Sequence, residues 1–135
     1  MILRVVLDAS AVSAYTESTG LVGELLAELA DETARLADSS LVVGFGVPDI
    51  SLATAAAQAA DADMIGVLMR HPLFATETEA IDTSDWVSVA GQLGNAETAA
   101  VVLLAMTADA YVVTRDVQRY AVALLDGLNI ITLTD

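Results

Sequence analysis

Residues 2–8, ILRVVLD, decide the class of fold of this chain. The run is apolar apart from Arg4, which is typical of a central parallel strand that is buried on both faces. It ends in Asp8, although aspartate is a poor strand residue and is rarely buried without a partner. Two interpretations of this carboxylate stay open: it caps a following helix, or it belongs to a metal site at the mouth of a sheet.

Strand-like and helix-like segments alternate along the rest of the chain. Small and apolar residues fill 9–17, and the leucines of 21–38 recur at helical spacing among carboxylates, which predicts an amphipathic helix. Further strands are expected at 41–48, 73–82, 111–116 and 129–133, and further helices at 49–72 (one long or two short), 84–93, 96–110 and 117–126. Asp49 and Asn95 are the expected caps of two of these helices.

This alternation predicts the architecture. Strands that alternate with helices over short connections form a mostly parallel sheet with helices on both faces. We therefore expect a single three-layer α/β/α domain over residues 1–135, with four to five strands in the central sheet.

Composition narrows the classes of function. The chain holds 19 acidic residues against five basic ones, all arginine, and its formal net charge is -14. Such a charge repels polyphosphate at long range. It either favours a basic partner protein or divalent cations, or serves only to keep the chain soluble. The apolar share is 56%, yet no apolar run approaches the roughly 20 residues that span a bilayer. The lack of cysteine and of a secretory leader pattern fits a cytoplasmic protein without a membrane partner.

Two acids are expected to meet at one edge of the predicted sheet. Asp8 closes the first strand, and Asp116 ends the segment 111–116, after Thr114. Ligands of such sheets bind beyond the carboxyl ends of the strands. Converging carboxylates repel each other unless a hard cation such as Mg²⁺ or Mn²⁺ lies between them. The alternative is that each of these acids caps the helix that follows it.

Other chemistries based on a strand-end aspartate lack a required residue. Phosphoryl-transfer sites of receiver domains and haloacid-dehalogenase phosphatases use a lysine, and this chain has none. A hydrolase that uses serine needs a base, and the one histidine, His71, is expected in a loop before Pro72. No glycine pattern matches a phosphate-binding loop.

Four segments together resemble the PIN domain, the fold of VapC-type ribonuclease toxins. VVLDASAVSAY (residues 5–15) is similar to the opening strand of that family, and AYVVTRD (110–116) is similar to its late strand with a hydroxyl-x-Asp ending. VPDISLATAAA (47–57) and ETAAVVLLAMTADA (97–110) are similar to its Pro-led and Ala-rich helices. The resemblance covers nearly the whole chain in the expected order.

The resemblance implies a site of four acids around one or two Mg²⁺ or Mn²⁺ ions, where metal-activated water cleaves single-stranded RNA. Asp8 and Asp116 match two of those acids. Thr54 stands where the family has a glutamate, and Thr98 stands where it has an aspartate. Glu97 would enter the site only through a shift of one residue, which turns a helix face by about 100° and requires a rearranged helix start.

Side chains next to these acids complete the expected site. Ser10 and Thr114 are the supporting hydroxyls that the resemblance implies, and Thr98 is a third. Arg115 and Arg119 are the local cations that could bind a phosphate. The alternative for both arginines is an ion pair with a nearby carboxylate.

Two hypotheses of function follow. The first is a Mg²⁺- or Mn²⁺-dependent ribonuclease of toxin–antitoxin type, with activity weakened or lost because two of four acids are replaced. The second is a catalytically inactive PIN-fold module that binds another protein, such as an antitoxin-like or other basic partner. The large apolar share also favours a homodimer. The stripe Leu21, Leu25 and Leu29 is either part of that interface or part of the core.

Overall fold

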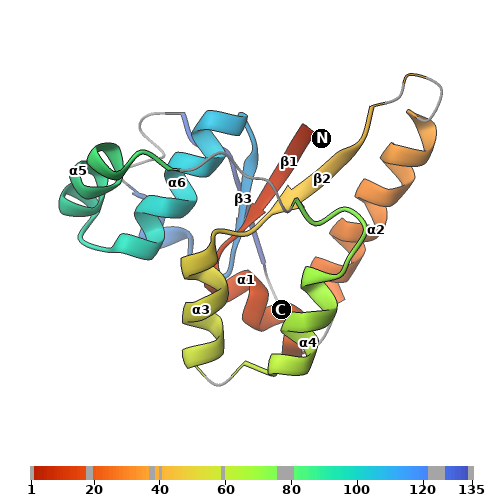
Figure 1. Cartoon of the computed structure of the whole chain (residues 1–135), viewed down its shortest axis with the longest axis horizontal. Coiled ribbons are helices and arrows are strands. Elements are labelled where there is room, and N and C mark those ends of the chain that lie inside the picture. Colours follow the sequence, from red (N-terminus) through yellow and green to blue (C-terminus); the bar gives the residue numbers. More distant parts are fainter. Residues whose placement is uncertain are drawn as a thin grey trace.

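The structure is a computed structural model that describes residues 2–17, 20–36, 39, 41–58, 60–75, 81–121 and 127–133. Its elements follow the predicted order except between α4 and α5, where a strand was expected (Figure 1). They are β1 (Ile2–Leu7), α1 (Ala9–Glu17), α2 (Gly20–Arg35), β2 (Val43–Gly46), α3 (Asp49–Ala57), α4 (Ala62–Met69), α5 (Thr83–Leu93), α6 (Ala96–Ala108), β3 (Tyr111–Thr114), the 3-10 helix η2 (Val117–Tyr120) and β4 (Ile130–Thr132). In these ranges no helix is both long and apolar enough to cross a lipid bilayer.

The four strands form one parallel sheet in the order β2-β1-β3-β4. The chain leaves β1 toward β2 on one side and returns to β3 on the other, so the strand order reverses at β1. The carboxyl ends of β1 and β3 therefore lie side by side at the switch point, where ligands of open parallel sheets bind. Asp8 and Thr114 are placed at this edge by the topology.

Successive side chains of β1 enter two different cores. Val5 and Leu7 pack with residues of α1, α2, β2, α3 and α4 on one face of the sheet. Val6 packs on the other face with α6 and with Tyr120 of η2. Successive side chains of β1 point to opposite faces of the sheet, and helices pack against both faces. This confirms the three-layer α/β/α class.

The leucine stripe of α2 is divided between core and solvent. Leu29 is buried and Leu25 is partly buried against the core, whereas Leu21 is 41% exposed. The buried face of the helix is instead completed by Val22 and Leu26. The predicted amphipathic helix is therefore present. Its buried face is formed by Val22, Leu26 and Leu29, so it only partly coincides with the predicted stripe.

The structure differs from two local predictions, the Asp49 cap and the strand at 73–82, and selects one of the two forms predicted for 49–72. Asp49 is the first residue of α3 and not its cap, because Pro48 occupies the cap position and makes no side-chain cap bond. Residues 49–72 form two short helices, separated where Asp61 caps α4. In the expected strand at 73–82, the described residues form only an isolated bridge from Phe74 to Phe45, and 76–80 lie outside the described residues.

The expected helix at 117–126 begins as a short 3-10 helix. Its described part is η2 with one further helical residue, Ala121, and 122–126 lie outside the described residues. This change matters for the site, because the tight turn after β3 directs Arg119 and Tyr120 toward the end of β1.

Candidate functional site

Asp8 lies at the centre of the site and is fully buried. Its Oδ1 accepts hydrogen bonds from the Ser10 hydroxyl at 2.6 Å and from the Ala11 backbone N–H at 3.0 Å. Its Oδ2 accepts a hydrogen bond from the Tyr120 hydroxyl at 2.7 Å. The bond to Ala11 is a helix cap, so the capping interpretation holds for Asp8, and the remaining contacts show that capping is only part of its role.

Glu97 approaches Asp8 from the first turn of α6 and is 5% exposed. Its Oε1 accepts hydrogen bonds from the Ala9 backbone N–H and from the Ser51 hydroxyl, each at 2.8 Å. The helix start needs no rearrangement to bring it there, because Asn95 caps α6 in the ordinary way, through the Thr98 N–H at 2.9 Å. The expected obstacle to Glu97 is therefore absent.

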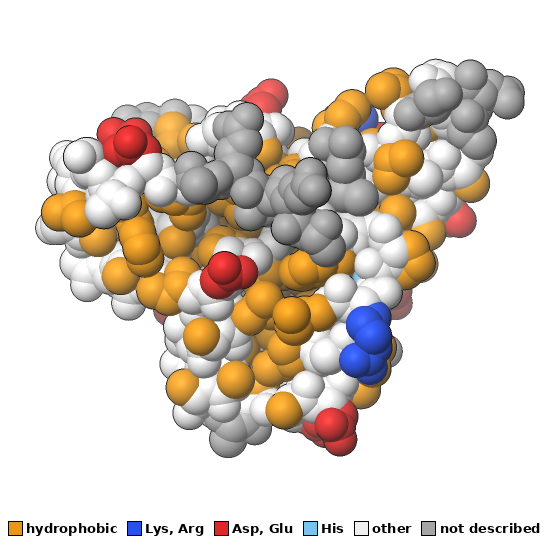
Figure 2. Space-filling model, in the orientation of Figure 1, with side chains coloured by type: hydrophobic (Ala, Val, Ile, Leu, Met, Phe, Trp, Pro, Cys, Tyr) orange, Lys and Arg blue, Asp and Glu red, His pale blue; other side chains and the backbone are white. Residues whose placement is uncertain are grey.

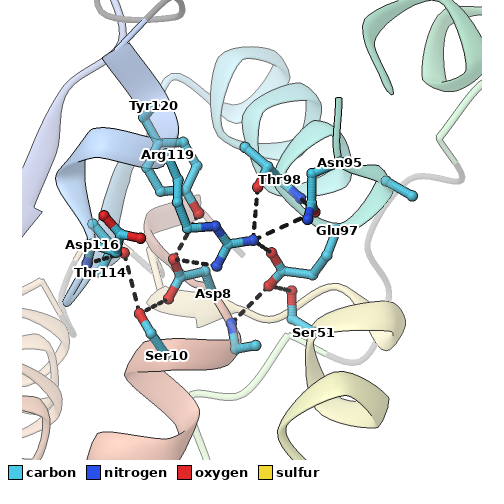
Figure 3. Close-up of polar contacts among 12 residues, drawn as sticks. Asp8, Ser10, Ser51, Asn95, Glu97, Thr98, Thr114, Asp116, Arg119 and Tyr120 are labelled. Carbon is cyan, nitrogen blue, oxygen red and sulfur yellow. Dashed lines mark hydrogen bonds and ion pairs between the residues drawn. The ribbon is translucent and has the colours of Figure 1, made fainter. Parts of the chain in front are cut away.

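Arg119 lies between the two buried carboxylates (Figure 3). Its Nη2 donates to Glu97 Oε2 at 2.5 Å and to Thr98 Oγ1 at 2.7 Å, and lies 3.5 Å from Asn95 Oδ1. Its Nη1 is 3.9 Å from Asp8 Oδ2. Partial burial alone would lower the pKa of Arg119, but the negative charges around it, Glu97 foremost, raise the pKa overall, so the guanidinium stays charged.

Tyr120 supplies the last donor to the pair of acids. Its ring is fully buried, and burial together with the charge of Asp8 raises the pKa of its hydroxyl far above the ordinary value of 10.0. The hydroxyl therefore keeps its proton and acts as a donor.

A second network joins the ends of β1 and β3. The Ser10 hydroxyl lies 3.2 Å from Thr114 Oγ1 and accepts the Arg115 backbone N–H at 2.9 Å. Thr114 Oγ1 accepts the Asp116 backbone N–H at 3.0 Å. Ser10 and Thr114 are thus brought to the site as the sequence predicts, and they tie its two strands together.

The Asp116 carboxylate stands apart from these contacts. Asp116 is exposed. The hydrogen bond that Figure 3 draws to it joins its backbone N–H to Thr114 Oγ1, and none is drawn to its carboxylate. It occupies the cap position of η2 without a side-chain cap bond, so the capping alternative does not hold for this residue. Among the described residues, no group of three or more histidine, cysteine, aspartate and glutamate side chains could hold a metal ion.

Both predicted phosphate-binding arginines form ion pairs with carboxylates. Arg115 Nη2 lies 2.6 Å from Glu17 Oε2, and Arg119 pairs with Glu97. The alternative interpretation of these two side chains is therefore the one that the structure shows.

The resident oxygen atoms do not fit a divalent cation. Each carboxylate oxygen of Asp8 and Glu97 already accepts at least one hydrogen bond, and Arg119 supplies a positive charge between them. Within the described part of the chain, every buried side-chain nitrogen or oxygen has a partner. A metal ion between Asp8 and Glu97 would have to displace the guanidinium of Arg119, which already supplies the positive charge there.

Sequence reasoning missed two residues of the site, Ser51 and Tyr120. Ser51 is fully buried one helical turn before Thr54, the position where a glutamate was expected. Its place in the first turn after Pro48 was the available signal, because a buried hydroxyl there needs a partner from another segment. Tyr120 follows Arg119 directly, but helical periodicity assigned it no role.

The comparisons with known proteins show the fold alone. No protein-family model and no curated protein matches the sequence. Among solved structures, the chain is similar to one described as "Crystal structure of PAE2754 from Pyrobaculum aerophilum", with a TM-score of 0.52 and 16% sequence identity over 90% of this chain and 86% of that one. This likeness extends over nearly the whole domain and agrees with the α/β/α architecture.

Proposed function

We propose that this chain is a PIN-like protein that has lost metal-dependent nuclease chemistry and works as a protein-binding module. One observation carries the proposal: Arg119 lies between Asp8 and Glu97, in the place where a hydrolytic site would need a cation and water. The replacement of expected acids by Thr54 and Thr98 supports it.

The surface favours a partner with basic groups. The net charge of -14 attracts cationic proteins at long range, whereas RNA is repelled. Apolar side chains gather over α3, α4 and α5 in the view of Figure 2, and Val67 and Val87 are 44% and 67% exposed. Such an apolar surface within an acidic chain suits a basic protein that also carries apolar side chains.

A cleavage assay separates this proposal from the weakened nuclease. Purified wild-type protein, Asp8→Asn and the exposed control Asp63→Asn are incubated with several single-stranded RNAs in Mg²⁺ and in Mn²⁺. We expect all three to leave the RNA intact. Metal-dependent cleavage by the wild type and Asp63→Asn, lost in Asp8→Asn, would refute the proposal and establish the nuclease.

A further inference from the structure

The described residues place one positive group, the Arg119 guanidinium, within a largely buried polar cluster that holds Asp8 and Glu97. Asp8 and Glu97 come from segments 89 positions apart in the numbering and are 0% and 5% exposed. The desolvation of two neighbouring carboxylates is costly unless a positive charge accompanies them. In this chain that charge comes from Arg119, which is itself only 26% exposed at its side chain.

The oxygen atoms converge on the guanidinium as ligands converge on an ion. Three of them, from Glu97, Thr98 and Asn95, lie 2.5, 2.7 and 3.5 Å from the single atom Nη2 of Arg119. Asp8 Oδ2 faces the other terminal nitrogen at 3.9 Å. All four are hard oxygen donors, the kind that Mg²⁺ and Mn²⁺ prefer.

We propose that the Arg119 side chain takes the place of a divalent cation, and that removing its guanidinium turns this polar cluster into a Mn²⁺- and Mg²⁺-binding site. The guanidinium permanently offsets one of the two buried negative charges and faces both carboxylates, so the folded wild-type chain needs no metal. This inference concerns cation binding by the free protein and does not depend on the partner proposed above.

The charge of Arg119, more than its hydrogen bonds, is the feature that matters in this proposal. Arg119→Lys keeps the positive charge but has fewer N–H donors, all on one nitrogen. Arg119→Gln keeps an amide donor and removes the charge. Arg119→Ala removes both and leaves space that is open to solvent on one side, since the arginine is partly exposed. These three variants separate the two contributions.

The test measures melting temperature and Mn²⁺ binding without RNA. Each variant is melted with and without Mn²⁺, and free Mn²⁺ is followed by electron paramagnetic resonance. We expect Arg119→Ala and Arg119→Gln to melt below the wild type and to regain stability in Mn²⁺. At Mn²⁺ ten times above its dissociation constant the regain is about 5 °C. The wild type and Arg119→Lys are expected to show neither the regain nor specific Mn²⁺ binding.

Two controls identify the polar cluster around Asp8 and Glu97 as the site of Mn²⁺ binding. Arg4→Ala removes an exposed arginine that pairs with Glu32, so it changes the net charge from -14 to -15 as Arg119→Ala does, and it is expected not to respond to Mn²⁺. The double variant Arg119→Ala with Glu97→Gln removes one acid together with the guanidinium and is expected to lose the response.

Several results would overturn the inference. One is specific Mn²⁺ binding by the wild type at the same affinity as Arg119→Ala, and another is an equal response of Arg4→Ala. A third is Arg119→Gln with wild-type stability and no response to Mn²⁺. If Arg119→Ala does not fold, Arg119→Gln carries the same comparison. RNA cleavage by the wild type would refute the proposed function. The inference about Arg119 would still be decided separately, by whether the Arg119 variants bind Mn²⁺ and the wild type does not.

Discussion

Tyr120→Phe tests how far the buried pair of acids depends on its neutral donor. The substitution removes the hydroxyl that donates to Asp8 Oδ2 at 2.7 Å and keeps the fully buried ring. Loss of a hydrogen bond to a charged group costs about 1.5–3 kcal/mol, because the buried oxygen keeps its desolvation penalty without a donor. We expect the free energy of unfolding to fall by about 2 kcal/mol, with the denaturant m-value unchanged.

The same substitution has a thermal signature. Unfolding entropy of about 2.1 cal/mol/K per residue over 135 residues gives about 0.28 kcal/mol/K, so the melting temperature should fall by about 7 °C. Tyr111→Phe is the matched control, because Tyr111 is 49% exposed and should lose less than about 0.5 kcal/mol. Equal losses in the two variants would refute the reasoning, since Asp8 would then not need this donor.

Tyr120→Phe should also change the alkaline limb of the stability curve. The hydroxyl ionises near pH 10.0 in the unfolded chain but at a far higher pH when folded. Above pH 10 the folded chain therefore binds more protons, and the free energy of unfolding falls by up to about 1.4 kcal/mol per pH unit. Urea titrations should show that this part of the slope disappears in Tyr120→Phe and remains in Tyr111→Phe.

Further substitutions probe neighbouring contacts. Ser51→Ala removes a buried donor to Glu97 and should lower the free energy of unfolding by about 1–3 kcal/mol in urea denaturation. Asn95→Ala removes the cap of α6 and should cost about 1 kcal/mol by the same measurement. Burial lowers the pKa of His71 below 6.5, so the unfolded chain binds more protons as the pH falls below that value and stability decreases. His71→Asn, which keeps an acceptor for the Leu73 N–H, should remove this part of the acid-side slope.

Exposed positions supply the controls for these substitutions. Ser84→Ala and Gln92→Ala, both on α5 and exposed, should change stability by less than about 0.5 kcal/mol. If Ser51→Ala matches Ser84→Ala, or Asn95→Ala matches Gln92→Ala, the corresponding bond does not stabilise the fold. If His71→Asn keeps the full slope between pH 7 and pH 5, other groups produce it.

The position of Arg119 beside Asp8 and Glu97 is the observation that best separates the two hypotheses drawn from the sequence. A weakened nuclease would need its surviving acids to hold an ion, but Asp8 and Glu97 hold a guanidinium and Asp116 is exposed. We therefore place the greater weight on the binding module. The buried ionic cluster joins α6, η2 and the residues that follow β1 in one arrangement, and this structural role does not require catalysis.

Local patterns in the sequence were enough to predict most of the elements and their order, although not the absence of a strand among the described residues of 73–82. The apolar run that forms β1, the helical repeat of α2 and the Asn95 cap of α6 each depend on contacts within one or two turns, or on burial along a single strand. The parallel sheet follows from their order, and with it the place of Asp8 at the carboxyl edge.

The content of the site was decided only by tertiary structure. Asp8 and Arg119 are separated by 111 positions, and no local signal tells which side chain fills the space beside a given carboxylate. A tight 3-10 turn in place of the expected helix points Arg119 and Tyr120 inward. The same residues on a regular helix would face other neighbours, because the direction of a side chain depends on the backbone that carries it.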